Sequence, residues 1–86
     1  MPRISYFYGI AIYIYYSDEN PPHFHARYGE HEARIVIATG AVLSGWLPRR
    51  AARLVSEWAD EHRGELRGCW ERAIAGEAPG SIEPLN

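Results

Sequence analysis

The chain has 86 residues, 47% hydrophobic and 13% aromatic, which leaves room for one compact domain with a single core. Its formal net charge of −2 excludes the global positive field that draws many proteins to nucleic acid. The single cysteine, Cys69, excludes an internal disulfide and indicates a reducing, cytoplasmic location.

The run RISYFYGIAIYIYYSD, residues 3–18, is rich in β-branched and aromatic residues and has one glycine, Gly9. It predicts two strands around a turn, because glycine readily adopts the positive φ of tight hairpin turns. In the second strand Ile10, Ile12 and Ile14 share one face, which we expect to be core, while tyrosines occupy the other. The run is too short to cross a bilayer and lacks a signal-peptide cleavage site, so we predict no contact with membranes.

The sheet is predicted to continue beyond SDENPP, residues 17–22, which combines turn-forming residues with two prolines that lack a backbone N–H. Two further strands, 23–28 and 31–38, flank a two-residue Gly-Glu hairpin turn. A second turn leads to a short strand at 42–45. The first half of the chain therefore predicts a meander of about five short strands.

From Pro48 onward the apolar residues recur at helical spacing, and proline suits the first turn of a helix. Gly64 lies in the middle of this stretch, where it either separates two helices or weakens one long helix. The predicted fold class is thus α+β: an antiparallel sheet followed by one long or two consecutive helices packed on one face. The apolar stripe comprises Leu47, Ala51, Leu54, Val55, Trp58, His62, Leu66, Cys69, Trp70, Ala73 and Ile74.

Within a single domain, 1–86, we distinguish a sheet portion (1–46), a helical portion (47–76) and a C-terminal tail (77–86). We expect Ile82 and Leu85 of the tail to dock on the core. We also expect the tryptophans to anchor it and Cys69 to be a buried thiol, not a nucleophile. The three tryptophans are Trp46, Trp58 and Trp70.

The hairpin around the Gly-Glu turn assigns two faces. With that turn, residue 28 pairs with 31, 27 with 32, 25 with 34 and 23 with 36. One face, expected to be core, collects Phe24, Ala26, Tyr28, Ala33, Ile35 and Ile37. The other face collects His23, His25, Arg27, Glu32 and Arg34, so the histidines and arginines share a surface.

One hypothesis for this polar face is acid–base chemistry on a phosphodiester. His23 and His25 titrate near neutrality and would act as base and acid. Arg27 and Arg34 would hold the phosphate and its developing charge, as in a metal-independent ribonuclease without a cofactor.

A second hypothesis is a site for zinc or another divalent metal. His23 and His25 lie about 6.6 Å apart along a strand, which allows both to reach one ion. A third ligand is then needed, and Asp18 is preferred over Glu30 and His31. His-x-His by itself is a weak motif.

A third hypothesis is purely structural. Exposed strand faces carry polar residues, and Arg27 would form an ordinary cross-strand ion pair with Glu32. The histidines would then only cap the preceding turn. The pattern of residues does not decide among the three hypotheses, and leaves open whether the chain is an enzyme.

Four segments together resemble a small bacterial family, the domain of unknown function numbered 4160. The combination of NPPHFH, the Gly-x-Leu-Pro step and two helical tryptophans twelve residues apart is specific, whereas no single piece is. Gly64 departs from the helix former expected there. In the resemblance, Pro21, Pro22, His23, Phe24 and His25 are the hallmark residues. The four segments are residues 1–40, 45–50, 54–71 and 81–85.

The resemblance implies a small, stand-alone cytoplasmic protein, often encoded beside a second small family numbered 2442, in an arrangement that resembles toxin–antitoxin pairs. The leading functional hypothesis is therefore a binding module held to a small partner protein through the tyrosine-bearing face or an exposed sheet edge. A homodimer and RNA are further partners to consider. The alternatives are the ribonuclease-type toxin and the metal-binding protein described above.

Overall fold

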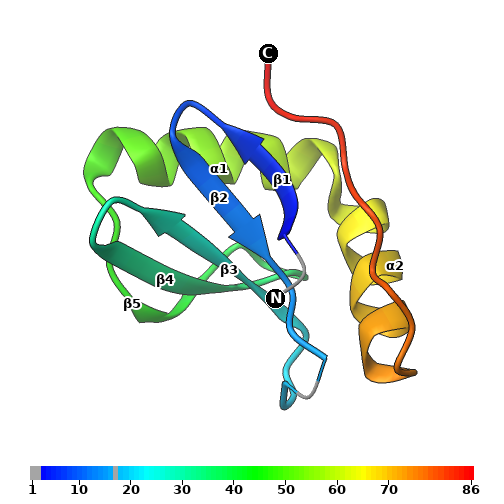
Figure 1. The fold of residues 1–86 in the computed structure, drawn as a ribbon. Coiled ribbons are helices and arrows are strands. Elements are labelled where there is room, and N and C mark those ends of the chain that lie inside the picture. Colours follow the sequence, from blue (N-terminus) through cyan, green and yellow to red (C-terminus); the bar gives the residue numbers. More distant parts are fainter. Residues whose placement is uncertain (1–2, 17) are drawn as a thin grey trace.

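The computed structural model describes residues 3–16 and 18–86. Five strands form one antiparallel sheet in the order β1-β2-β3-β4-β5, and two helices follow (Figure 1). This arrangement confirms the predicted α+β class. Ser17, in the predicted turn, lies outside the described residues, as do Met1 and Pro2. The elements are β1 (Arg3–Phe7), β2 (Ile10–Tyr13), β3 (His23–Tyr28), β4 (His31–Val36), β5 (Val42–Gly45), α1 (Arg49–Glu61) and α2 (Arg63–Ile74).

The hairpin turns explain why the sheet is a simple meander. Tyr8 and Gly9 both have positive φ, 49° and 79°, the conformation whose twist matches that of the flanking strands. The β3–β4 pairing has the predicted register, with His25 opposite Arg34. Strand β4 ends at Val36, two residues earlier than expected, because the chain turns through Gly40 back into β5.

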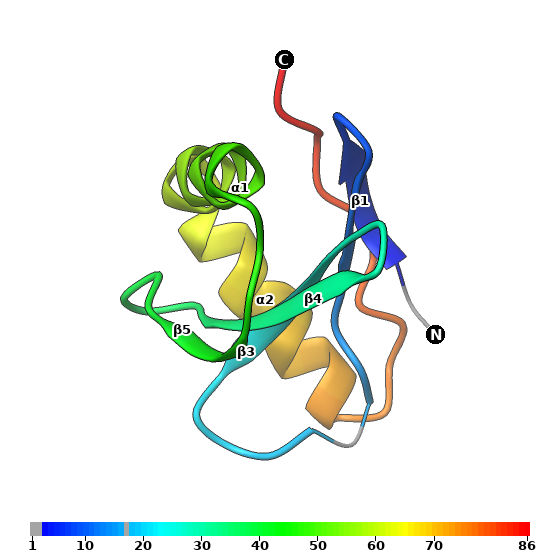
Figure 2. The same ribbon diagram turned by 90° about the vertical axis from the view of Figure 1, so that its left-hand side faces the viewer.

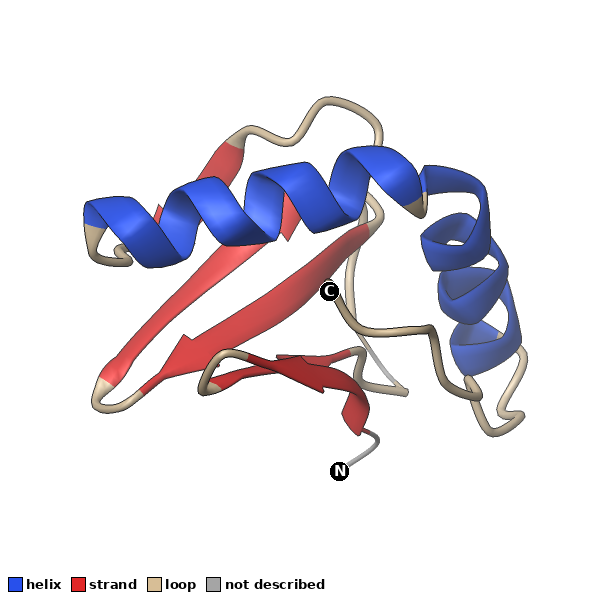
Figure 3. Cartoon of the chain, turned by 90° about the horizontal axis from the view of Figure 1, so that it is seen from above, coloured by secondary structure: helices blue, strands red, loops and turns tan. Residues whose placement is uncertain are grey.

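The helices are two, and they do not meet at Gly64. Helix α1 runs across one face of the sheet, and α2 turns away from α1 and packs near β3 (Figure 3). The break lies at His62, whose φ of −124° is not helical and whose N–H donates to the carbonyls of Trp58 and Ala59. Gly64 is the second residue of α2 and is compatible with the helix.

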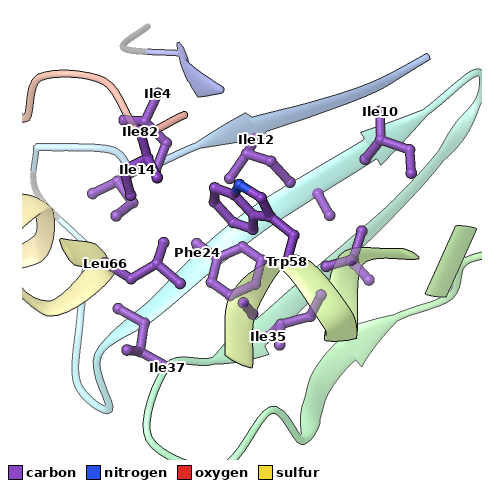
Figure 4. Close-up of a cluster of buried hydrophobic side chains, with 14 of the residues drawn as sticks. Ile4, Ile10, Ile12, Ile14, Phe24, Ile35, Ile37, Trp58, Leu66 and Ile82 are labelled. Carbon is purple, nitrogen blue, oxygen red and sulfur yellow. The ribbon is translucent and has the colours of Figure 1, made fainter. Parts of the chain in front are cut away.

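The core lies between α1 and the sheet face that carries the isoleucines of β2. Trp58 is fully buried, and its ring centroid lies 5.2 Å from that of Phe7 and 5.9 Å from that of Phe24. Leu66 of α2 extends the core toward Ile37 (Figure 4). Both expected core faces of the strands are confirmed except at Tyr28, which lies at the end of the hairpin and is exposed.

Two further expectations about the core were wrong. Trp46 is 61% exposed, because it follows the edge strand β5. Its ring is nearly perpendicular to that of His31, with 4.9 Å between centroids. Ile74 is exposed at the end of α2, where the helix extends past the sheet. Trp58, Trp70 and Cys69 are buried as predicted.

The C-terminal tail returns along α2 to the edge of the sheet (Figures 1 and 2). Ile82 is buried, and its N–H donates to the carbonyl of Ile4 in β1 at 2.8 Å. The Arg72 guanidinium donates twice to the carbonyl of Pro79, at 3.0 and 2.6 Å. The predicted docking of the tail is thus confirmed. No helix within residues 3–16 and 18–86 is long and apolar enough to cross a membrane.

Two glycines differ enough to give a paired test of the fold. A Cβ on Gly45, whose φ is +83°, would collide with the backbone carbonyl of Glu32 and lie 2.9 Å from the Cα of Ala33. A Cβ on Gly64 meets nothing within 4 Å. Gly45→Ala should therefore destabilise the protein by about 2 kcal/mol or more, and Gly64→Ala should stabilise it by about 0.5–1 kcal/mol. Urea unfolding measures both, and equal effects would contradict the two backbone environments.

Candidate metal centre

The polar cluster at the start of β3 is built from three side chains. Asp18 lies in the loop between β2 and β3, and His23 and His25 project from the same face of β3 because they are two residues apart. The Nε2 atoms of His23 and His25 lie 3.3 and 3.0 Å from one atom, Oδ2 of Asp18. The nitrogen and oxygen atoms available as ligands all lie within 4.8 Å of one another.

The other nitrogen of each histidine is already occupied. His23 Nδ1 lies 2.8 Å from the carbonyl oxygen of Pro21, and His25 Nδ1 lies 3.1 Å from Oε2 of Glu32. Carbonyl and ionised carboxylate oxygens only accept hydrogen bonds, so His23 Nδ1 carries a proton. His25 has a carboxylate oxygen at each ring nitrogen, Glu32 Oε2 at Nδ1 and Asp18 Oδ2 at Nε2, so it donates from one nitrogen or from both. Metal-binding histidines are oriented by the same kind of bond from their second nitrogen to a carbonyl or carboxylate.

Both histidines are buried, which the hypothesis of an exposed polar face did not anticipate. His23 is 1% exposed and its ring lies 5.3 Å from that of Trp70 in α2, while His25 is 8% exposed. Tyr15 packs edge-on against His25, with 4.3 Å between ring centroids. The Nε2 atom of His23 is buried and has no hydrogen-bond partner among the described residues.

This convergence needs a cation. Where Nδ1 alone carries a proton, the lone pair of Nε2 faces the negatively charged Asp18 carboxylate, and that repulsion is costly at buried atoms. A proton on Nε2 or a metal ion between the three groups removes the conflict. Ligands held about 2.0–2.2 Å from one ion at angles of about 90–110° lie about 2.8–3.6 Å apart. The separations of 3.0 and 3.3 Å fall in that range.

The remaining predicted site residues lie at the edge of this cluster or outside it. Arg27 and Arg34 are on the same sheet face but exposed, and Arg34 Nε donates to Ser44 Oγ at 2.7 Å. Glu30 and His31 lie at the hairpin turn, at the far end of β3 from Asp18. Of the alternatives for a third ligand, the structure therefore brings only Asp18 to the histidines.

Glu32 has a different partner from the one expected. It stands opposite Arg27 in the sheet register, yet no ion pair joins these two residues in the described part of the chain. Its carboxylate accepts from His25 instead, on the diagonal between neighbouring strands, a position that long side chains reach. The predicted register already placed Glu32 on the diagonal from His25. The direct pairing of Glu32 with Arg27 made an ion pair between those two residues the simpler expectation.

Trp70 could not be placed over His23 from sequence. It belongs to the apolar stripe of the second helix, and only the packing of α2 across the end of β3 brings the two rings together. His23 does cap the preceding turn through Pro21, as the structural hypothesis predicted, although this uses only one of its two nitrogens.

The Tyr15 phenol and the Cys69 thiol both keep their protons at neutral pH. Burial raises the pKa of the Tyr15 phenol, and the negative charges of Glu32 and Asp18 contribute to the rise, so the phenol keeps its proton beside the cluster. Burial also raises the pKa of the Cys69 thiol against the opposing effect of Arg72. Cys69 is therefore a structural thiol, because nucleophilic cysteines need a lowered pKa.

Comparison with known proteins gives one match. The family model for the domain of unknown function DUF4160 matches residues 9–71. This span includes Asp18, both histidines, Glu32 and Trp70, but leaves out β1 and the C-terminal tail, so it is narrower than the resemblance noted from the sequence. No curated protein and no solved structure matches the chain.

Proposed function

We propose, from the premise that the chain belongs to the DUF4160 family, that it binds one divalent transition-metal ion through Asp18, His23 and His25. One observation carries this proposal: two buried histidines, each held by its Nδ1, direct their Nε2 atoms at the same carboxylate oxygen. In a purely structural hydrogen-bond network, a buried nitrogen such as His23 Nε2 would normally have a hydrogen-bond partner, and among the described residues it has none.

The ligand set defines the class of metal. Two imidazole nitrogens and one carboxylate oxygen suit Zn²⁺, Fe²⁺ and neighbouring first-row ions better than Ca²⁺ or Mg²⁺, which prefer oxygen ligands. Three protein ligands leave at least one position for water or a substrate, as in catalytic and not structural zinc sites. The acid–base hypothesis is less well supported, because both Nδ1 atoms are engaged and both Nε2 atoms face Asp18.

The direct test is metal stoichiometry. Protein stripped with a chelator is equilibrated with Zn²⁺ by dialysis, and bound metal is measured by mass spectrometry. We expect one ion per chain in the wild type and loss of that ion in His25→Ala and Asp18→Ala. Glu32→Gln should weaken binding about 10- to 100-fold, because it alters the acceptor that orients His25 without removing a ligand.

The matched control is His31→Ala, which removes a histidine from the same hairpin but from outside the cluster. It should leave stoichiometry unchanged. Binding of Zn²⁺ that is equally weak in the wild type and in His25→Ala would overturn the proposal and leave the cluster as a buried ion-pair network. Repeating the titration with Fe²⁺, Mn²⁺ and Ni²⁺ ranks the metals.

Binding of a partner protein, as one half of a two-gene module of the toxin–antitoxin kind, is a second candidate function. A cleft of about 400 Å³ between α1 and the last two strands favours it, together with the exposed apolar side chains of the edge strand β5. An extended segment of a small partner protein that added to this edge would place alternate side chains in the cleft. The apolar residues in and around it include Ala33, Ile35, Val42, Trp46, Val55 and Ala59.

A pull-down with the product of the adjacent gene tests this second function. Val42→Glu and Trp46→Glu should abolish capture, because each places a charge at the apolar cleft. Tyr16→Glu, on an exposed residue outside the cleft, should not. Capture that none of these variants affects would exclude the β5 edge as the interface.

A further inference from the structure

We infer that the open face of the sheet beside the metal centre binds single-stranded nucleic acid, with one phosphate directed to the metal. This inference rests on the proposed metal site for the position of that phosphate. It also has an independent basis in the side chains that the strand register places in rows on this face. Helix α1 covers the other face of the sheet (Figure 3).

The rows follow from the register. Tyr13 of β2 lies opposite His25 of β3, His25 opposite Arg34 of β4, and Arg34 opposite Ser44 of β5. Directly opposite side chains in an antiparallel sheet project from the same face and are close neighbours. A metal ligand is therefore flanked by an aromatic ring on one side and a cation on the other.

The two arginines on this face pair with no acid in the part of the chain that the structure describes. Arg27 and Arg34 are exposed, and among the described residues neither forms an ion pair. Arg34 is instead steadied by the neutral hydroxyl of Ser44. Glu32 is the acid on the same strand pair, and its carboxylate lies against His25 Nδ1. Two guanidinium groups are thus left free to pair with phosphates, which they recognise through paired N–H donors.

The spacing suits a chain of phosphates better than one small anion. Arg27 lies two residues along β3 from His25, about 6.6–6.8 Å, which resembles the spacing of successive phosphates in an extended strand. A phosphate on the metal and the next on Arg27 would therefore follow the direction of β3. The two arginines attract phosphates locally although the net charge of the chain is −2.

The aromatic side chains supply surfaces for bases. Tyr13 of β2 and Tyr15, just after that strand, project from the same face of the sheet as His25. Their rings are parallel within 3°, with 6.0 Å between centroids. Tyr13 is half-buried, so part of its side chain is accessible. Flat sheets that combine aromatic rings with arginines bind single strands because unstacked bases lie on the rings. A duplex keeps its bases stacked and does not fit this arrangement.

The test is fluorescence anisotropy with a labelled eight-nucleotide RNA of mixed sequence, titrated with metal-loaded protein in low salt. We expect a Kd of about 1–100 μM. Arg27→Gln and Arg34→Gln should each reduce the slope of log K against log salt by about 0.7. Tyr13→Ala should weaken binding about 5- to 100-fold. Arg67→Gln, which removes an exposed arginine from α2, is the matched control and should change neither quantity.

Metal content is measured on every sample, so that loss of RNA binding is separated from loss of metal. No RNA binding up to millimolar protein at full metal occupancy would overturn the inference and leave the metal site intact. Equal losses with Arg67→Gln, or equal affinity for a duplex, would overturn it as well. If the wild type binds RNA but no metal, the metal proposal fails while the sheet face stands as the binding surface.

Discussion

Replacing Trp58 by alanine is expected to cost about 3–5 kcal/mol of the free energy of unfolding. Trp58 is fully buried between α1 and the sheet, where it contacts Phe7 and Phe24. Its indole Nε1 also donates to the carbonyl of Glu83 at 2.8 Å, so the same side chain holds the C-terminal tail. A domain of this size has a total stability of roughly 4–13 kcal/mol. The variant should therefore lose a large part of the total free energy of unfolding, as measured by guanidinium denaturation.

Trp46→Ala is the matched control, because it removes the same side chain from a position that is 61% exposed. Its effect on stability should stay within about 0.5 kcal/mol. Trp58→Phe separates the two contributions of the indole, since it keeps a buried ring and loses the bond to Glu83. If Trp58→Ala and Trp46→Ala cost the same, the core is not centred on α1 and the packing described above is incorrect.

The difference between these tryptophans shows what sequence patterns reveal about this fold. Alternation along the strands gave the correct core face and register of the β3–β4 hairpin, since a single turn and a period of two determine both. Helical periodicity placed Trp58 and Trp70 in the core correctly. The prediction that Trp46 anchors the core was wrong because this residue belongs to neither pattern. It follows β5, and whether a residue beside an edge strand is covered depends on packing between distant segments.

The position of the helix break illustrates a second limit. Gly64 and Gly68 are the weak helix formers in the stretch, yet the break occurs at His62. Differences in helix propensity amount to about 1 kcal/mol per residue. Burying Leu66, Cys69 and Trp70 against the end of the sheet stabilises the fold by more than that, so this packing decides where α2 begins.

The candidate site was visible in the sequence only in part. His-x-His on a strand predicts two side chains on one face, but burial of those side chains depends on Trp70 from α2. Asp18 was one of three possible third ligands, because the loop that precedes His23 has no periodicity from which to place its residues. The partners that orient the two Nδ1 atoms, Pro21 and Glu32, could be identified only from the structure.

His23→Phe is expected to change the stability of the protein in opposite directions with and without metal. In the metal-free protein the substitution removes the unpartnered, buried Nε2, a gain of about 1–3 kcal/mol, and loses one hydrogen bond to Pro21, a cost of about 1 kcal/mol. The phenyl ring keeps the packing against Trp70. In a chelator the variant should therefore be as stable as the wild type, or up to about 2 kcal/mol more stable.

With Zn²⁺ at 100 times its Kd the wild type gains about 2.7 kcal/mol, and the variant, which lacks a ligand, gains little. For a domain of this size that difference corresponds to roughly 10–20 °C in Tm. Thermal unfolding of both proteins in chelator and in Zn²⁺ measures the reversal, and His31→Phe, outside the cluster, should show none. If His23→Phe is instead less stable by several kcal/mol in both conditions, His23 is a structural core residue. A wild type that is less stable in chelator than in Zn²⁺ is the expected result, because the bound ion takes the place of a proton between the buried Nε2 atoms and the Asp18 carboxylate.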